Sequence, residues 1–248
     1  MFRSTAFCET GPVATESSDT RCDGGTVCVM TTRTGPWIDS NIVEYLRAHT
    51  APPDEIVQWI TEQTSALGKF AAMQIGPDQV AFMTLLTRLV GARNAVEVGT
   101  FTGTSALAIA RGLAPGGRLV CCDVSEEWTA IAREGWRRAG VDDRIELRIA
   151  PGLETLKELP NDPVIDLVFI DADKPSYMAY LDALIPRVRP GGLVLVDNTI
   201  WFGQIINTDV NDRDTVAIRE VNDAMAADER LDSVMIPIGD GLTVARKR

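Results

Sequence analysis

Two acidic residues and an asparagine follow two apolar runs, each at the point where the run would leave a sheet. Asp171 comes directly after Phe169-Ile170, and Asp197-Asn198 come directly after Leu195-Val196. Because neighbouring parallel strands end at one edge, we expect these three side chains to meet there. Their oxygens are hard donors that suit Mg²⁺, with Mn²⁺ or Ca²⁺ as alternatives, rather than zinc. Three protein ligands would leave positions for a bidentate substrate. The plainer interpretation is acids that solvate strand ends.

A lysine, Lys174, lies three residues after Asp171. Close to a divalent cation a lysine should have a lowered pKa, so it could act as a general base. The cation would also lower the pKa of a coordinated phenol, as it does for water. We therefore assign Asp171 and Lys174 to catalysis. The alternative is a surface lysine or a simple salt bridge.

A glycine turn follows another apolar run, in Glu97-Val98-Gly99-Thr100-Phe101-Thr102-Gly103. Gly99 would let the backbone approach a ligand closely, and Gly103 would permit a tight start of the next helix, whose first N–H groups are free. A nicotinamide-dinucleotide fingerprint needs glycine where this chain has Phe101. Glu97 precedes the first glycine, a place where a carboxylate can hold an ammonium group.

An acid, Asp123, ends the next apolar run, 24 residues after Gly99. A carboxylate at this place can accept hydrogen bonds from both hydroxyl groups of a ribose. With Glu97 it indicates a nucleoside that carries a cationic amino-acid tail, and S-adenosylmethionine fits that description. The alternative is a plain tight turn and a surface acid.

The elements that must position these residues alternate between short apolar strands and helices. Three helical stripes come first, at 37–48, from Asp54 onward and at 78–89. We then predict helices at 105–112, 126–139, 153–159, 177–188 and 216–227, and an irregular loop at 199–213. The predicted strands are 95–99, 118–122, 145–149, 165–170, 193–196, 234–238 and 242–246. Nearly continuous apolar strands that alternate with helices indicate an α/β fold with a parallel sheet covered on both faces.

The last two predicted strands form a hairpin around Gly239-Asp240-Gly241, so the sheet should be mixed. We divide the chain into a disordered extension at 1–35 and one domain at 36–248. That domain comprises a helical segment, 36–92, and the α/β core, 93–248. The extension is rich in Ser, Thr, Gly and Cys, with little periodicity.

The composition limits the kinds of partner that we expect the protein to bind. The 248 residues carry a net charge of −11 and a single histidine, His49. The acidic balance disfavours nucleic acid and anionic membrane surfaces, and no run is apolar enough to span a bilayer. Of the five cysteines, Cys8, Cys22, Cys28, Cys121 and Cys122, we expect the last two to lie in a buried strand as free thiols. Free thiols in a core suggest a reducing compartment.

The glycine turn, the segment Asp171-Ala172-Asp173-Lys174-Pro175-Ser176-Tyr177 and the segment Asp197-Asn198-Thr199-Ile200-Trp201 together resemble a known family. It is the divalent-cation-dependent O-methyltransferases, the caffeoyl-CoA and catechol O-methyltransferase-like group. The closing segment around Gly239-Asp240-Gly241 is also similar to that group, and the resemblance runs from about Ile38 to Arg246. It implies a Rossmann-like class I methyltransferase fold, in a cytoplasmic homodimer.

The resemblance also implies roles for individual residues. Asp171, Asp197 and Asn198 would hold the metal, Lys174 would assist deprotonation, and Trp201 would line the pocket for a small catechol-like acceptor. The residues implied in binding S-adenosylmethionine are Met73, Ile75, Glu97, Gly99, Thr100, Ser105, Asp123, Val124, Ala150 and Asp171.

Two positions depart from the family pattern. Ile75 stands where plant relatives often have a hydroxyl residue, and Ala150-Pro151-Gly152 alters the order of small residues near the expected adenine. Three other functions compete with the prediction. They are a nicotinamide-dependent oxidoreductase, a methyltransferase that needs no metal and acts on another acceptor such as RNA or protein, and a non-catalytic module that only binds the cofactor.

Overall fold

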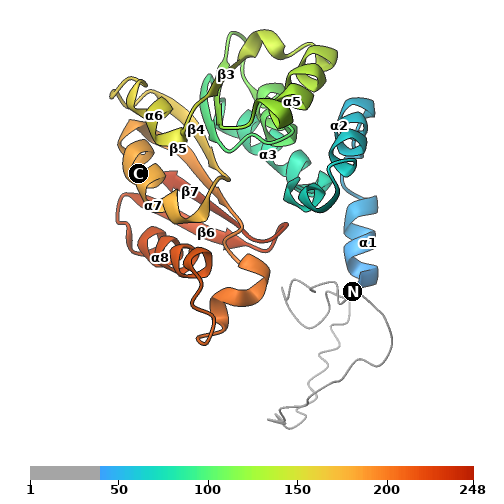
Figure 1. The fold of residues 1–248 in the computed structure, drawn as a ribbon. Helices are drawn as coiled ribbons and strands as arrows, with labels where there is room; N and C mark the ends of the chain where they lie inside the picture. The colour runs from blue at the N-terminus through green and yellow to red at the C-terminus, as the bar shows by residue number, and fades with distance from the viewer. Residues whose placement is uncertain (1–39) are drawn as a thin grey trace, which may run out of the picture. The chain divides into compact units, whose positions relative to one another are not determined.

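The computed structural model describes residues 40–248 (Figure 1). The predicted extension at 1–35 and the cysteines Cys8, Cys22 and Cys28 lie outside the described residues. The α-helices are α1 (Ser40–Ala48), α2 (Glu55–Ser65), α3 (Pro77–Val90), α4 (Thr104–Gly112), α5 (Glu126–Ala139), α6 (Gly152–Lys157), α7 (Tyr177–Leu184) and α8 (Arg213–Ala227). Short 3₁₀ segments are η1 (Gly68–Met73), η2 (Asp142–Arg144), η3 (Lys174–Ser176), η4 (Ile185–Arg187) and η5 (Trp201–Ile206).

The strands form one mixed sheet in the order β3-β2-β1-β4-β5-β7-β6. Their bounds are β1 (Asn94–Val98), β2 (Arg118–Asp123), β3 (Ile145–Ile149), β4 (Ile165–Ile170), β5 (Val188–Asp197), β6 (Leu231–Ile236) and β7 (Leu242–Lys247). The first five strands pair in parallel, and β7 pairs antiparallel with both β5 and β6. The predicted α/β class, the strand number and the closing hairpin are therefore confirmed.

Side chains of the central strands alternate between two cores, one on each face of the sheet. Val96 and Val168 belong to the core that α6, α7 and α8 cover. Ala95 and Leu167, one residue earlier on the same strands, belong to the core beneath α2 to α5. Cys121 and Cys122 are buried free thiols within β2, as predicted. Because both faces are covered, polar side chains can reach solvent from this sheet chiefly where the strands end.

Three predicted boundaries were wrong for local reasons. The helix from Tyr177 ends at Leu184 rather than 188, since Pro186 cannot donate a helical hydrogen bond and the chain continues as η4. Strand β5 begins at Val188 rather than 193, because Val188 already pairs with Ile165 of β4. The register then shifts before Leu193, in the stretch where Gly191 has a φ of 80°. The predicted loop after β5 contains η5, and β6 begins three residues earlier than predicted.

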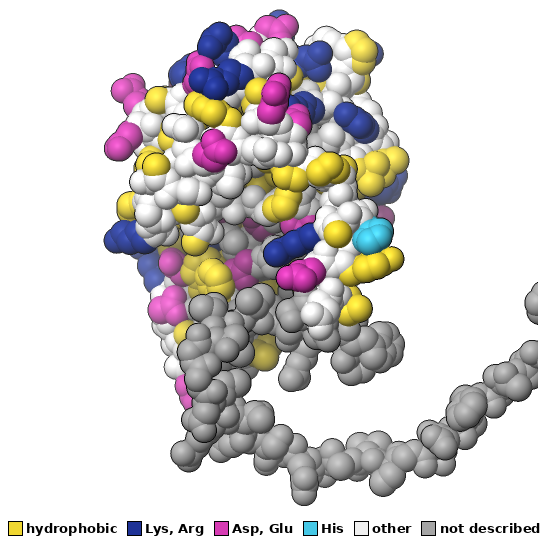
Figure 2. Space-filling view, turned by 90° about the vertical axis from the view of Figure 1, so that its right-hand side faces the viewer, with side chains coloured by type: hydrophobic (Ala, Val, Ile, Leu, Met, Phe, Trp, Pro, Cys, Tyr) yellow, Lys and Arg dark blue, Asp and Glu magenta, His cyan; other side chains and the backbone are white. Residues whose placement is uncertain are grey.

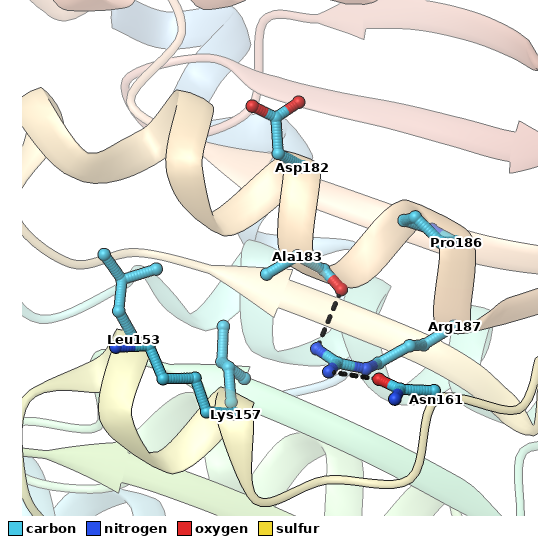
Figure 3. A pocket seen from close by; sticks show the side chains of 8 residues that line it. Leu153, Lys157, Asn161, Asp182, Ala183, Pro186 and Arg187 are labelled. Carbon is cyan, nitrogen blue, oxygen red and sulfur yellow. Dashed lines mark hydrogen bonds between the residues drawn. The ribbon is translucent and has the colours of Figure 1, made fainter.

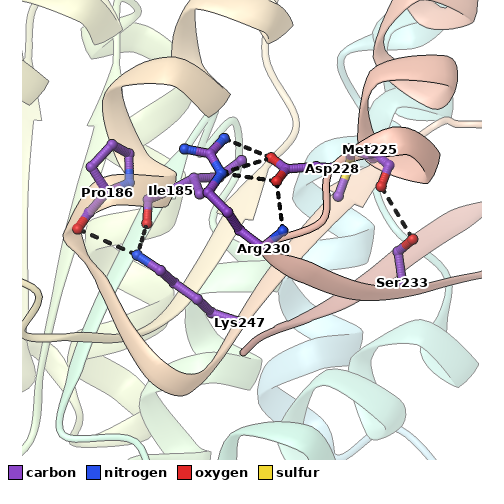
Figure 4. A network of polar contacts seen from close by, with 7 residues as sticks. All are labelled: Ile185, Pro186, Met225, Asp228, Arg230, Ser233 and Lys247. Carbon is purple, nitrogen blue, oxygen red and sulfur yellow. Dashed lines mark hydrogen bonds and ion pairs between the residues drawn. The ribbon is translucent and has the colours of Figure 1, made fainter.

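The carboxyl end of β7 is held by a small polar network on the α7–α8 side (Figure 4). Lys247 Nζ donates a hydrogen bond to the Ile185 carbonyl at 2.7 Å, and Arg230 forms an ion pair with Asp228 at 2.6 Å. The Lys247 bond joins the terminal hairpin to η4, and the ion pair orders the turn between α8 and β6. Among the described residues, no helix is long and apolar enough to cross a membrane.

Candidate active site at the carboxyl edge of the sheet

The predicted oxygen ligands meet at the ends of neighbouring strands. Strands β4 and β5 run in parallel with Ile170 opposite Val196, so Asp171 and Asp197 leave the sheet side by side. Asn198 follows with a φ of 59°, a left-handed conformation that asparagine adopts more readily than most residues. Trp201 and Phe202 also have positive φ angles, and for such bulky residues the strain persists only where the surrounding structure holds it. Here the tip of the β6–β7 hairpin does so, since the Gly241 carbonyl accepts from Thr199 N at 3.0 Å.

The Lys174 ammonium group lies among these ligands. Its Nζ donates to Asp171 Oδ1 at 3.0 Å, to Asn198 Oδ1 at 2.5 Å and to the Tyr177 hydroxyl at 2.6 Å. The lysine side chain is only 10% exposed, which excludes the simple surface lysine. Two of the three predicted metal ligands thus already converge on one positive charge, so the ammonium group marks a place that suits a cation.

The third ligand, Asp197, is the most buried of the three. Burial raises its pKa to about 7, and the nearby negative charge of Asp171 adds to the effect. Two adjacent acids held in a low-dielectric edge favour an extra positive charge between them. Within residues 40–248, no three His, Cys, Asp or Glu side chains cluster as metal ligands. The predicted set consists of two carboxylates and one amide, a donor chemistry that fits Mg²⁺.

The glycine turn between β1 and α4 is packed against this edge. Gly99 has a φ of 91°, and a Cβ there would lie 1.9 Å from the Asp171 carbonyl oxygen. Gly103 has a φ of 84° and accepts a hydrogen bond from Trp136 Nε1 at 3.0 Å through its carbonyl. Gly99 is therefore required by the neighbouring strand end, and it joins the predicted cofactor turn directly to the predicted metal ligand.

The carboxylate of Glu97 is completely buried below the turn. Its Oε2 accepts from the Thr100 hydroxyl at 3.0 Å, whereas its Oε1 has no hydrogen-bond partner within the described part of the chain. Burial raises the pKa of Glu97 to about 7. An unpartnered buried carboxylate oxygen has a large affinity for a positively charged donor, so Glu97 fits the ammonium group of the predicted cofactor.

The second predicted cofactor acid, Asp123, also orders the turn. Its Oδ2 accepts from the backbone N–H groups of Thr100 at 2.9 Å and Phe101 at 2.8 Å, and its Oδ1 accepts from Ser125 N at 2.8 Å. Each carboxylate oxygen can accept further bonds. The Asp123 carbonyl accepts a hydrogen bond from Ala150 N at 2.9 Å, so these two residues, each predicted to bind the cofactor, lie side by side.

Comparison with known proteins agrees with this geometry. The model of the O-methyltransferase family matches residues 47–248. The chain belongs to the O-methyltransferase family. The predicted family, fold class and enzyme class are confirmed.

Individual relatives cover most of the chain. It is 34% identical over 213 residues to the Dictyostelium discoideum protein named "Probable caffeoyl-CoA O-methyltransferase 1", covering 84% of this chain and 93% of that protein. It is 36% identical over 184 residues to caffeoyl-CoA O-methyltransferase 1 of Eucalyptus globulus, covering 71% and 75%. An O-methyltransferase of Bacillus cereus, solved in complex with S-adenosylhomocysteine, superposes with a TM-score of 0.76 at 31% identity, covering 84% and 97%.

The remaining predicted residues of this O-methyltransferase differ in how far they are buried. Thr100 and Ser105 are buried in the turn and in α4. Met73 and Val124 are exposed, at 49% and 70%, so their side chains can meet a ligand from solvent. Ile75 is half-buried between η1 and α3.

The predicted acceptor residue, Trp201, lies beside the lysine. Its ring centroid is 5.7 Å from Lys174 Nζ and 5.7 Å from the Phe202 ring. Both aromatic residues have positive φ angles. Arg219 of α8 holds the segment that follows, since its guanidinium donates to four backbone carbonyls, those of Gln204, Ile205, Asn207 and Val210.

Three contacts of the site were not predicted from the sequence. Gln79 bonds to Asp197 across 118 residues, and Tyr177 bonds to Lys174. Phe101 packs edge-on against Trp128, with ring centroids 5.1 Å apart. A Phe at the third position of the glycine turn was the one available signal for that aromatic pair.

A groove of about 460 Å³ lies elsewhere, between α6 and α7 (Figure 3). Leu153 and Lys157 face Ala183 and Arg187 across it, and the guanidinium of Arg187 is engaged by the Ala183 carbonyl and by Asn161. None of the predicted site residues lines this groove. The groove is therefore separate from the predicted site at the carboxyl edge of the sheet.

Proposed function

We propose that this O-methyltransferase transfers a methyl group from S-adenosylmethionine to one hydroxyl of a small aromatic with two adjacent hydroxyl groups, assisted by a divalent cation. The observation that carries the proposal is the convergence of Asp171 Oδ1 and Asn198 Oδ1 on a single positive charge. The buried acid Asp197 stands beside them. A protein edge built in this way can hold a cation and leave room for two oxygens of a substrate.

The methyl donor would bind along the glycine turn. The unpartnered Glu97 Oε1 would accept the ammonium group of the methionine end. Asp123 would accept the ribose hydroxyls with its remaining lone pairs, and Ala150 and Val124 would lie beside the adenine. The Bacillus cereus relative was solved with the demethylated form of this donor, which supports the assignment.

In the reaction, the residues of the chain chiefly orient the reactants and move one proton. A divalent cation, held by Asp171, Asp197 and Asn198, would lower the pKa of the acceptor hydroxyl. Lys174, in its neutral form, would take the hydroxyl proton on Nζ. The acceptor oxygen would then attack the methyl carbon in line, the carbon–sulfur bond would break, and the bonding pair would stay on the sulfur of S-adenosylhomocysteine.

The acceptor side would suit a compact aromatic ring that carries no phosphate groups. Trp201 would pack against the ring, and Phe202, whose ring centroid is 5.7 Å from that of Trp201, would extend the apolar wall. Residues 199–212 contain no Lys or Arg, and they include the acids Asp209 and Asp212. Such a segment offers no partner for the phosphates of a coenzyme A thioester, so we propose a free catechol as the acceptor.

We also propose a cytoplasmic homodimer. Hydrophobic side chains gather on the face that carries the single histidine (Figure 2). On α1, Tyr45 and Leu46 are 60% and 53% exposed, and apolar faces of this kind are typical of subunit contacts. The buried free thiols Cys121 and Cys122 suit a reducing compartment. Light scattering after size exclusion would measure the mass directly, and a monomer at micromolar concentration would contradict the dimer.

The decisive experiment for the function is methyl transfer from S-adenosylmethionine to caffeic acid, followed by mass spectrometry with Mg²⁺ and with EDTA. We expect a methylated product that disappears with EDTA. A product that still forms with EDTA would support the methyltransferase activity and refute the role of the cation. No product with any catechol tested, despite cofactor binding, would refute the acceptor class.

A further inference from the structure

A glutamine of α3 reaches the predicted cation site from the far side. Gln79 is 1% exposed, and its Nε2 donates a hydrogen bond to Asp197 Oδ2 at 3.0 Å. The two residues are 118 positions apart, so only the packing of α3 against the end of β5 brings them together.

The bond completes the orientation of the Asp197 carboxylate. Its other oxygen, Oδ1, accepts from Asn198 N at 2.8 Å. With one N–H donor on each oxygen, the carboxylate plane cannot rotate without breaking a buried hydrogen bond. Each oxygen keeps lone pairs that face away from its donor. The Asp171 carboxylate has a different partner, because its Oδ1 accepts a hydrogen bond from Lys174 Nζ. A bound cation would displace that ammonium group.

The glutamine is itself held in place by the hairpin tip. A Cβ on Gly239 would lie 2.6 Å from Gln79 Oε1, so the tip closes against the amide. The same tip holds the chain after Asn198, because the Asp240 carbonyl accepts from Ile200 N at 2.9 Å. One support, made of α3 and the β6–β7 turn, therefore contacts both Asp197 and the segment that follows it.

We propose that Gln79 is a positioning residue, which orients Asp197 for a divalent cation through the bond from Nε2 to Oδ2. The inference rests on the cation site of the proposed function. A neutral amide is suited to this task, since it supplies a hydrogen-bond donor without adding a third negative charge or a competing positive charge beside the acids. Removing a hydrogen-bond partner of a metal ligand typically lowers metal affinity by about 10- to 100-fold.

The test is calorimetric titration of the protein with Mn²⁺ alone. Gln79→Met fills a similar volume without a donor, and Gln79→Asn keeps the amide but is one methylene too short to reach Asp197. Thr84→Val is the matched control, because Thr84 lies on the same helix and bonds to the carbonyls of Val80 and Ala108, away from the site.

We expect both Gln79 variants to bind Mn²⁺ about 10- to 100-fold more weakly, while Thr84→Val and the Kd for S-adenosylmethionine stay within about twofold of wild type. Saturating Mn²⁺ should restore most of the kcat of the Gln79 variants. General destabilisation of the fold would lower kcat even at saturating Mn²⁺. If folded Gln79→Asn bound Mn²⁺ with wild-type affinity, the role of Gln79 would be refuted and the cation site would stand. A wild-type protein that binds no Mn²⁺ would overturn the cation site and the inference together.

Discussion

Replacing Glu97 by Gln removes the buried charge that the proposed cofactor ammonium group would neutralise. Burial raises the pKa of this carboxyl from 4.5 to about 7, which corresponds to about 3 kcal/mol against the ionised form. The folded chain therefore keeps this proton up to about pH 7, whereas the unfolded chain releases it near pH 4.5. The contribution of Glu97 to stability is fully present below pH 4.5 and is lost as the pH rises through 7.

The amide introduced by Glu97→Gln does not titrate, so the variant isolates this effect. Without cofactor, we expect the free energy of unfolding of Glu97→Gln, relative to wild type, to increase by about 2 kcal/mol between pH 5 and pH 8. Urea denaturation followed by circular dichroism would measure it. Glu127→Gln is the control, because Glu127 is exposed on α5 and should show no such trend.

Burial favours the protonated form of Glu97, whereas binding of the cofactor's ammonium group would favour the ionised form. At pH 8 the variant loses a charge-assisted hydrogen bond of about 1.5–3 kcal/mol, so its Kd for S-adenosylmethionine should rise about 10- to 100-fold. At pH 6 the wild type must first release the Glu97 proton, and the difference should shrink about tenfold. Calorimetry in two buffers of different ionisation enthalpy should detect that proton. Equal affinities of wild type and Glu97→Gln at pH 8 would refute the assignment of Glu97 to the ammonium group.

Three further changes test other parts of the site. Gly99→Ala should destabilise the fold by at least about 3 kcal/mol, since its Cβ would lie 1.9 Å from the Asp171 carbonyl; Gly116→Ala, with a φ of 74° and open space, should cost only about 1 kcal/mol in the same denaturation assay. Lys174→Met should lower kcat about 10²- to 10⁴-fold, and a wild-type kcat would be the contrary result. The kcat/KM for caffeic acid should exceed that for its coenzyme A thioester, and the reverse order would contradict the argument from the charge of residues 199–212.

Much of the site follows from local sequence. Asp171, Asp197 and Asn198 were predicted to meet because each follows an apolar strand directly, and parallel strands necessarily end at one edge. The turn at Gly99 was predicted because a glycine lets the backbone approach a neighbouring group closely. These features depend on spacing within a few residues of one strand, so the amino-acid sequence determined them, together with the α/β class and the closing hairpin.

The tertiary structure alone decided how those groups are held. The backbone bonds of Asp123 and the position of the Lys174 ammonium group between two ligands depend on how loops from different strands fold onto each other. Gln79 reaches Asp197 across 118 residues, and the hairpin tip supports the strained backbone after β5. Spacing along the chain carries no information on such contacts, because they arise from the packing of α3 and the β6–β7 hairpin against the end of β5.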